Sequence, residues 1–176
     1  IRPIDIVSVI ETIVDDHADQ GHSVSLSGTG HGRVLGRLLA LKRAFWNIVG
    51  NAVKYGSHVT VAVDETSAGF AITVEDDGPG IPDGDMERVF QPFVRLEESR
   101  GRETGGSGLG LTIARAVVIA HGGEINLANR PEGGLRVTIL LPQLAQSEQM
   151  LAQAIAGNAM SVHGTAAREM ANPSSI

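Results

Sequence analysis

The sequence contains no cysteine among its 176 residues, which excludes disulfide bonds and thiolate metal sites. No apolar run approaches the roughly 18 residues that a membrane-spanning helix needs, so we expect no membrane segment in this chain. The 14 Lys and Arg residues are outnumbered by 20 Asp and Glu, and they form no basic run that would indicate a nucleic-acid surface. We expect a cytoplasmic location. The first residue, Ile1, is not Met, so we also expect a longer parent, which can itself be an inner-membrane protein.

Aromatic residues make up only 3% of the chain, so a core must be mainly aliphatic. Hydrophobic residues at 42% and charged residues at 19% are typical of a globular domain. We expect one such domain over residues 1–142. After Pro142 the chain is rich in Ala, Gln, Ser and Asn, and over residues 143–176 we expect a C-terminal tail, a marginal helix followed by a disordered end.

Hydrophobic periodicity predicts three helices and several strands. Apolar residues at helical spacing predict helices over residues 5–18, 38–55 and 109–121. Alternating apolar residues predict a hairpin over 59–63 and 70–74. Further strands are expected over residues 24–27, 33–35, 124–127 and 135–141.

The second predicted helix carries two stripes. Its apolar residues form one face, while Asn47, Asn51 and Lys54 recur at i, i+4 and i+7 on its flank. Amide oxygens suit a hard cation, and an ammonium suits an anion. A surface helix that merely contains asparagines would show the same pattern, so this segment alone leaves both interpretations open.

A second candidate site follows the predicted strand over 70–74. Asp76 stands at the end of this strand and is followed by Gly78 and Gly80, which allow close approach of the backbone to a ligand. A carboxylate there can accept a hydrogen bond from the exocyclic amine of adenine, whereas guanine presents a carbonyl instead. An acidic turn after a strand is an equally good interpretation of these residues alone.

A glycine run leads into the third predicted helix. Glycines at a helix start expose backbone N–H groups, which together with the helix dipole favour phosphate. The run lacks the Lys of a Walker A loop and the spacing of a dinucleotide-binding fingerprint. A flexible linker would look similar. The residues concerned are Gly106, Ser107, Gly108, Leu109 and Gly110, with Arg95, Arg100 and Arg102 just upstream.

The order of these motifs resembles the catalytic ATP-binding domain of sensor histidine kinases, in the superfamily of the gyrase, Hsp90 and MutL ATPases. The resemblance covers residues 1 to about 142. Its four boxes correspond to Asn47–Tyr55, Asp76–Gly80, Phe90–Phe93 and Gly106–Gly110. It implies an α+β fold, a two-layer sandwich in which a mixed sheet packs on three helices, known as the Bergerat-type ATP-binding fold.

The resemblance also implies ATP and Mg²⁺ as ligands. On the base side, Asp76 would accept the adenine amine, Gly78 and Gly80 would lie against the base, and Tyr55 would pack on the adenine or ribose. Residues 82–107 would form a lid over the nucleotide, with Phe90 and Phe93 as its hinge.

On the phosphate side, the resemblance implies that Asn51 ligates the metal with Asn47 in support. Lys54 would touch phosphate, and Arg95 or Arg102 would close on the triphosphate. The start of the third helix would bind the same phosphates through Gly106, Ser107, Gly108, Leu109 and Gly110.

The sequence departs from the family in one respect. None of its six histidines is followed by the acidic residue and proline that mark the phosphoacceptor. No catalytic residue is therefore expected in this chain. We expect a monomeric fragment that binds Mg·ATP and phosphorylates a separate phosphoacceptor (dimerisation) domain, which in turn serves a response regulator. An anti-sigma-type serine kinase, the ATPase module of a dimerising clamp, and a regulatory or scaffold module without kinase activity are the alternatives.

Overall fold

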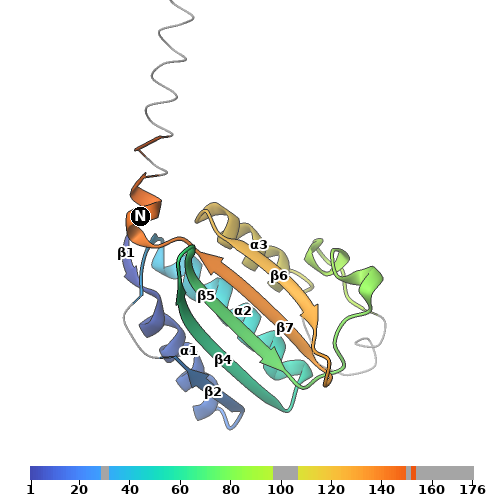
Figure 1. The fold of residues 1–176 in the computed structure, drawn as a ribbon. Helices are drawn as coiled ribbons and strands as arrows, with labels where there is room; N and C mark the ends of the chain where they lie inside the picture. The colour runs from blue at the N-terminus through green and yellow to red at the C-terminus, as the bar shows by residue number, and fades with distance from the viewer. Residues whose placement is uncertain (29–31, 97–106, 150–151, 154–176) are drawn as a thin grey trace, which may run out of the picture.

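The computed structural model describes residues 1–28, 32–96, 107–149 and 152–153, and its body is a sheet with helices on one face (Figure 1). The sheet has five strands in the order β2-β4-β5-β7-β6. Only β2 and β4 pair in parallel, and the other neighbours are antiparallel, so the sheet is mixed as expected. The strands are β2 (Ser23–Ser27), β4 (His58–Thr66), β5 (Gly69–Asp76), β6 (Glu124–Asn129) and β7 (Leu135–Leu141).

Three helices form the second layer, which confirms the predicted α+β two-layer fold. α2 contacts α1 on one side and α3 on the other, and it packs on β4 and β5. Two short 3-10 turns lie between the end of β5 and α3 in the chain. The elements are α1 (Ile6–Asp19), α2 (Leu38–Tyr55), α3 (Gly110–Ala120), η1 (Asp83–Asp85) and η2 (Arg88–Phe90).

The core lies between the two layers. Val61, Ile72 and Ile139 come from adjacent strands and are fully buried on the helix side of the sheet. Phe45 and Ile48 of α2 are equally buried. Burying each side chain of this size contributes roughly 1.5–3 kcal/mol, so the apolar stripe of α2 fixes which of its faces remains free for a ligand.

A two-stranded sheet precedes α2. β1 (Arg2–Asp5) pairs antiparallel with β3 (Arg33–Gly36). Sequence periodicity missed β1, because four residues that include Pro3 carry no clear alternation. Asp5 ends this strand and caps α1, since its Oδ1 accepts hydrogen bonds from the backbone N–H groups of Val7 and Ser8.

Most predicted element boundaries lie within three residues of those observed, and the bounds of α2 and β7 are the same. Residues 144–149 are helical. The expected disordered end falls largely outside the described residues, so the division at residue 142 stays a prediction. In the part of the chain that the structure describes, no helix combines the length and the apolar character that crossing a membrane requires.

Candidate nucleotide-binding site

Asn47 and Asn51 of α2 lie against the start of α3. Both are half-buried, on the flank of the buried apolar stripe. The side-chain amide of Asn47 donates a hydrogen bond to the backbone carbonyl of Gly110 across 3.3 Å. A Cβ added to Gly110 would lie 3.6 Å from the Cβ of Asn47 and 3.8 Å from Nδ2 of Asn51. The two asparagines and the first residue of α3 therefore lie together.

The first turn of α3 suits an anion. The residue at its N-cap is Leu109, which has no side-chain oxygen to accept a bond from the first backbone N–H groups, and the turn holds no acidic residue. The positive end of the helix dipole is thus not neutralised by these residues. Gly108, just before it, has a φ of 69° and accepts a hydrogen bond from the backbone N–H of Phe93 at 3.1 Å.

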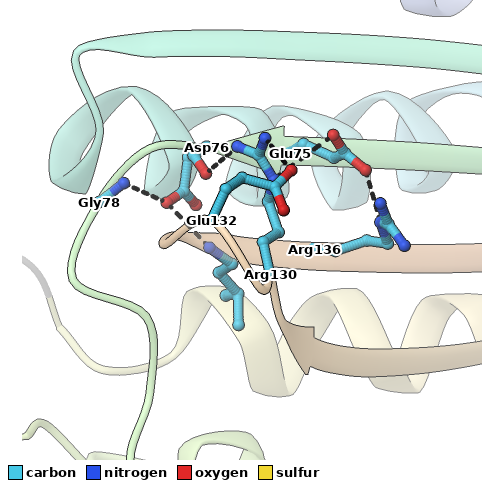
Figure 2. Close-up of polar contacts among 7 residues, drawn as sticks. Glu75, Asp76, Gly78, Arg130, Glu132 and Arg136 are labelled. Carbon is cyan, nitrogen blue, oxygen red and sulfur yellow. Dashed lines mark hydrogen bonds and ion pairs between the residues drawn. The ribbon is translucent and has the colours of Figure 1, made fainter.

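Asp76 is one of the few buried polar residues, with 4% of its surface exposed. Its Oδ1 accepts hydrogen bonds from the backbone N–H groups of Gly78 at 2.9 Å and Leu135 at 3.3 Å (Figure 2). Burial raises the pKa of this carboxyl above its ordinary value, and the two backbone bonds offset only part of that effect. Among the described residues, Oδ2 accepts no hydrogen bond, so this oxygen is available to an incoming donor.

The neighbouring carboxylate, Asp77, has a different role. Its Oδ1 accepts from the backbone N–H groups of Ser57 at 2.6 Å and His58 at 2.9 Å, and its Oδ2 contacts the His58 ring at 2.9 Å. These bonds hold the pKa of Asp77 well below its usual range. Asp77 therefore closes the turn between α2 and β4, and Asp76 alone of this pair keeps an unused oxygen.

The end of α2 lies beside Asp76. A Cβ added to Gly56 would lie 2.8 Å from the Cβ of Asp76, and one added to Gly78 would lie 2.8 Å from the carbonyl oxygen of Tyr55. Gly78 is thus required by close packing within the protein, in addition to any approach of a ligand. Lys54 and Tyr55 are half-buried here, with Nζ of Lys54 5.0 Å from the centre of the Tyr55 ring.

The two phenylalanines expected to act as a hinge differ from each other. Phe90 is buried, and the guanidinium of Arg115 lies 4.6 Å from the centre of its ring. Phe93 is 74% exposed and has a φ of 66°, which is uncommon for a residue other than glycine. Of these two phenylalanines, only Phe90 packs into the core.

Among the residues that it describes, the structure does not bring the remaining predicted phosphate-binding residues together. Ser107 and Arg95 are exposed. Arg102 and Gly106 lie outside the described residues, as does most of the glycine run before Ser107. Their predicted contacts with the triphosphate stay predictions.

Sequence reasoning missed the turn between β6 and β7. Gly80 has a φ of 73°, and a Cβ added there would lie 2.5 Å from Oδ1 of Asn129. Arg130 donates from Nη1 to the backbone carbonyl of Asp76 at 2.8 Å (Figure 2). The signal available in the sequence was Asn129-Arg130 followed by Gly133-Gly134 between two strands. The pairing of β5 with β7 that brings this turn to Asp76 is not visible in the sequence.

The described residues contain no group of three or more His, Cys, Asp or Glu side chains that could hold a metal ion. A metal at this site would therefore be bound by an amide oxygen of the protein together with oxygens of the phosphate that it accompanies. Asn51 fits that requirement, because none of the hydrogen bonds found among the described residues uses its side chain, and magnesium prefers oxygen ligands shared with phosphate.

Comparison with known proteins gives a consistent result. The family described as histidine kinase-, DNA gyrase B- and HSP90-like ATPase matches residues 36–145. The sensor histidine kinase GtrS of Pseudomonas aeruginosa is 38% identical over 144 residues, which is 82% of this chain and 29% of GtrS. The sensor histidine kinase CpxA of Escherichia coli is 46% identical over 112 residues, or 61% of this chain and 24% of CpxA. The chain thus spans less than a third of the length of these curated relatives.

Solved structures are also similar. The mycobacterial sensor histidine kinase MprB superposes with a TM-score of 0.68 at 28% identity, covering 81% of this chain and 97% of the MprB chain. The ATP-binding domain of PrrB from Mycobacterium tuberculosis gives a TM-score of 0.67 at 29% identity, covering 81% and 96%.

Proposed function

The chain belongs to the family of histidine kinase-, DNA gyrase B- and HSP90-like ATPases, and we propose that it is the ATP-binding catalytic domain of a sensor histidine kinase. One observation carries the proposal. The amides of α2, the start of α3 and the buried Asp76 carboxylate lie along the C-terminal half of α2, in the chain order of the family. The similarity to GtrS and CpxA, both named sensor histidine kinases, supports the kinase branch of this family.

Adenine is the base that suits Asp76. Oδ1 is held by two backbone N–H groups, and Oδ2 is left to accept the exocyclic amine. A hydrogen bond to a charged group contributes about 1.5–3 kcal/mol, and guanine would oppose its carbonyl to the carboxylate. Tyr55, Gly78 and Gly80 border this end and would flank the base.

The phosphates would lie toward Asn51 and the start of α3. Backbone N–H groups from Ser107 to Gly110 and the ammonium of Lys54 would bind their oxygens, and Arg95 and Arg102 would approach from the lid segment. Bound Mg²⁺, with Asn51 as its protein ligand and Asn47 in support, would supply charge neutralisation at the β- and γ-phosphates. The asparagine side chains offer oxygen atoms that suit the metal. The lysine, the arginines and the backbone offer N–H groups that suit the phosphate oxygens.

The chemistry is phosphoryl transfer to a histidine outside this chain. An imidazole nitrogen forms a bond to the γ-phosphorus while the bond to the β–γ bridging oxygen breaks, and ADP leaves. This chain contributes orientation of the γ-phosphate and exclusion of water, with no acid or base of its own.

The described histidines support a separate acceptor. Three of the four are engaged within the fold: His17 is buried, His58 pairs with Asp77, and His121 accepts from the backbone N–H of Arg37 and donates to the carbonyl of Val117. The fourth, His22, is exposed. None has the sequence context of a phosphoacceptor. The partners are therefore a phosphoacceptor domain and, after it, a response regulator.

A phosphotransfer assay tests this proposal. The purified chain is mixed with γ-labelled ATP, Mg²⁺ and the isolated helical hairpin domain of a related sensor kinase such as CpxA. We expect label on the hairpin that is stable to alkali and labile to acid, which is the behaviour of phosphohistidine, and no label on this chain. Acid-stable label on a serine of a partner would favour the anti-sigma-type serine kinase. Nucleotide binding with no transfer to any hairpin would favour the regulatory module.

A further inference from the structure

The turn that follows β5 is in contact with the turn between β6 and β7 through its backbone. A Cβ added to Gly134 would lie 1.9 Å from the carbonyl oxygen of Asp76, closer than any real Cβ contact. Asp76 also receives the backbone N–H of Leu135, the first residue of β7, on its Oδ1. The position of the Asp76 carboxylate thus depends directly on the β6–β7 turn.

Arg130 binds one end of the segment from Asp76 to Ile81. Its Nη1 donates to the backbone carbonyl of Asp76 at 2.8 Å, and its Nη2 donates to Glu132 at 2.7 Å (Figure 2). Its Nε lies 3.6 Å from Oε2 of Glu75. Two carboxylates therefore hold the planar guanidinium in place, with its side chain only 19% exposed, so that it donates to Asp76 in one fixed direction.

Asn129 binds the other end of the same segment. Its Oδ1 accepts from the backbone N–H of Ile81 at 2.9 Å, and its Nδ2 donates to the carbonyl of Ile81 at 2.7 Å. A side-chain amide that pairs with both backbone groups of one residue fixes the position of that residue as a strand partner would. The segment from Asp76 to Ile81 is thereby held at both ends from the same turn.

We infer that Arg130 and Asn129 are positioning residues for base selection, which hold the Asp76 carboxylate where it distinguishes adenine from guanine. The inference rests on the proposed ATP site. Both side chains bind backbone atoms of the segment and leave the free Oδ2 of Asp76 untouched. Hydrogen bonds weaken steeply when their angle or length changes, so a loosened segment loses the bond to the adenine amine first. The proposed phosphate contacts of α2 and of the start of α3 lie on elements that the side chains of Arg130 and Asn129 do not bind in the hydrogen bonds described above.

Arg136 provides a matched control. It is also an arginine at this edge of the sheet, and its Nε donates to Oε1 of Glu75, the carboxylate that Arg130 approaches through Oε2 (Figure 2). Its hydrogen bond and its ion pair are both with Glu75, and neither is with the segment from Asp76 to Ile81. Replacing it removes the same charge without releasing Asp76.

The experiment measures Kd for Mg·ATP and Mg·GTP by calorimetry, using the purified 176-residue chain and its Arg130→Met, Asn129→Ala and Arg136→Met variants. We expect Arg130→Met and Asn129→Ala to raise Kd for ATP about tenfold and to change Kd for GTP less than twofold. Arg136→Met should keep the wild-type preference. A general loosening of the fold would weaken the binding of both nucleotides alike. The ratio of the two affinities therefore distinguishes a loss of Asp76 positioning from a loss of overall stability.

Arg130→Lys serves if Arg130→Met fails to fold. It keeps the positive charge opposite Glu75 and Glu132 and replaces the planar fork by one ammonium, so a smaller loss of ATP preference is expected. Wild-type preference for ATP that survives in the Arg130 and Asn129 variants, or equal weakening of both nucleotides, would overturn the inference while leaving the ATP site in place. A folded wild type that does not prefer ATP would overturn the proposed function and this inference with it.

Discussion

The side-chain amide of Asn47 donates to the carbonyl of Gly110 across 3.3 Å, which ties the middle of α2 to the first residue of α3. Asn51, one helical turn later, lies against the same glycine and makes no comparable bond among the described residues. The side chains of the two asparagines therefore differ in their hydrogen bonding. Asn47 joins two helices, whereas the side-chain amide of Asn51 makes no hydrogen bond among the described residues.

Substitution of each asparagine by alanine separates these roles. We expect Asn47→Ala to lower the free energy of unfolding by about 1 kcal/mol, the usual net contribution of such a hydrogen bond, and to weaken ATP as α3 shifts. Asn51→Ala should leave stability nearly unchanged and abolish the effect of Mg²⁺ on ATP affinity. Denaturant unfolding and calorimetry with and without Mg²⁺ measure both. Full Mg²⁺ dependence in folded Asn51→Ala would refute its assignment as the metal ligand.

Asp76→Asn should keep or raise the stability of the nucleotide-free protein and should lower its affinity for ATP. Burial raises the pKa of Asp76, so its ionised form opposes folding, and the stability that this group contributes is lost as pH rises through its folded-state pKa. At neutral pH, the neutral amide should therefore unfold at the same temperature as the wild type or higher. ATP affinity should fall roughly tenfold to a hundredfold, since the charge-assisted bond is lost.

Thermal unfolding with and without ATP checks this prediction. The stabilisation by ATP should be smaller in Asp76→Asn than in the wild type at equal ligand concentration. A nucleotide-free variant that melts clearly below the wild type would show that the carboxylate is mainly structural.

The buried His17 predicts a pH dependence of stability. Its ring stacks on Trp46 with centroids 4.3 Å apart, and neither ring nitrogen has a hydrogen-bond partner in the part of the chain that the structure describes. Burial lowers the pKa of His17 from the usual 6.5, His22 lowers it further, and Asp16 opposes them. The unfolded chain thus binds this proton more readily than the folded one. The stability that the buried, neutral His17 contributes should be fully present above pH 6.5 and should decline as pH falls below this value.

Trp46 is the only tryptophan, so its fluorescence reports on this contact. Urea unfolding followed at pH 5 to 8 should show the decline in the wild type and much less of it in His17→Phe, which keeps an aromatic ring without a titrating group. His22→Gln, at an exposed position, should keep most of the decline, since burial is the larger cause of the lowered pKa of His17. Identical pH profiles for the wild type and His17→Phe would contradict the assignment.

Two glycines before and at the start of α3 should respond differently to alanine. Gly108 has a φ of 69°, and its added Cβ would lie 2.9 Å from the backbone of Phe93, so Gly108→Ala should lower stability by about 1 kcal/mol or more. The Cβ added to Gly110 meets only ordinary contacts, at 3.6 Å and beyond. Gly110→Ala should therefore fold normally, and a loss of ATP affinity in it would report on the site itself. Circular dichroism melting compares the two.

Local patterns in the sequence were enough to predict α2 and β7 to the residue, because each carries an uninterrupted period that only one structure satisfies. The same patterns identified Asp76 and the asparagine stripe as candidates. They did not show that the adjacent Asp77 has a different role, since that difference lies in burial and in the turn that His58 closes. The family resemblance implied one shared role for Phe90 and Phe93, of which only the first is buried.

Asn129 and Arg130 were out of reach for a further reason. They lie about fifty residues along the chain from the segment that they bind, and they reach it only because β7 pairs with β5. Strand order is a tertiary property, so a local pattern contains no trace of it. Site residues of this kind become visible only in the assembled sheet.

The most direct test of the account is calorimetric titration of the folded wild-type chain with ATP and with GTP, each with and without Mg²⁺. The account predicts saturable one-site binding of ATP that tightens with Mg²⁺, and at least tenfold weaker binding of GTP. Equal affinity for the two nucleotides, or no binding of ATP by the folded chain, would contradict it.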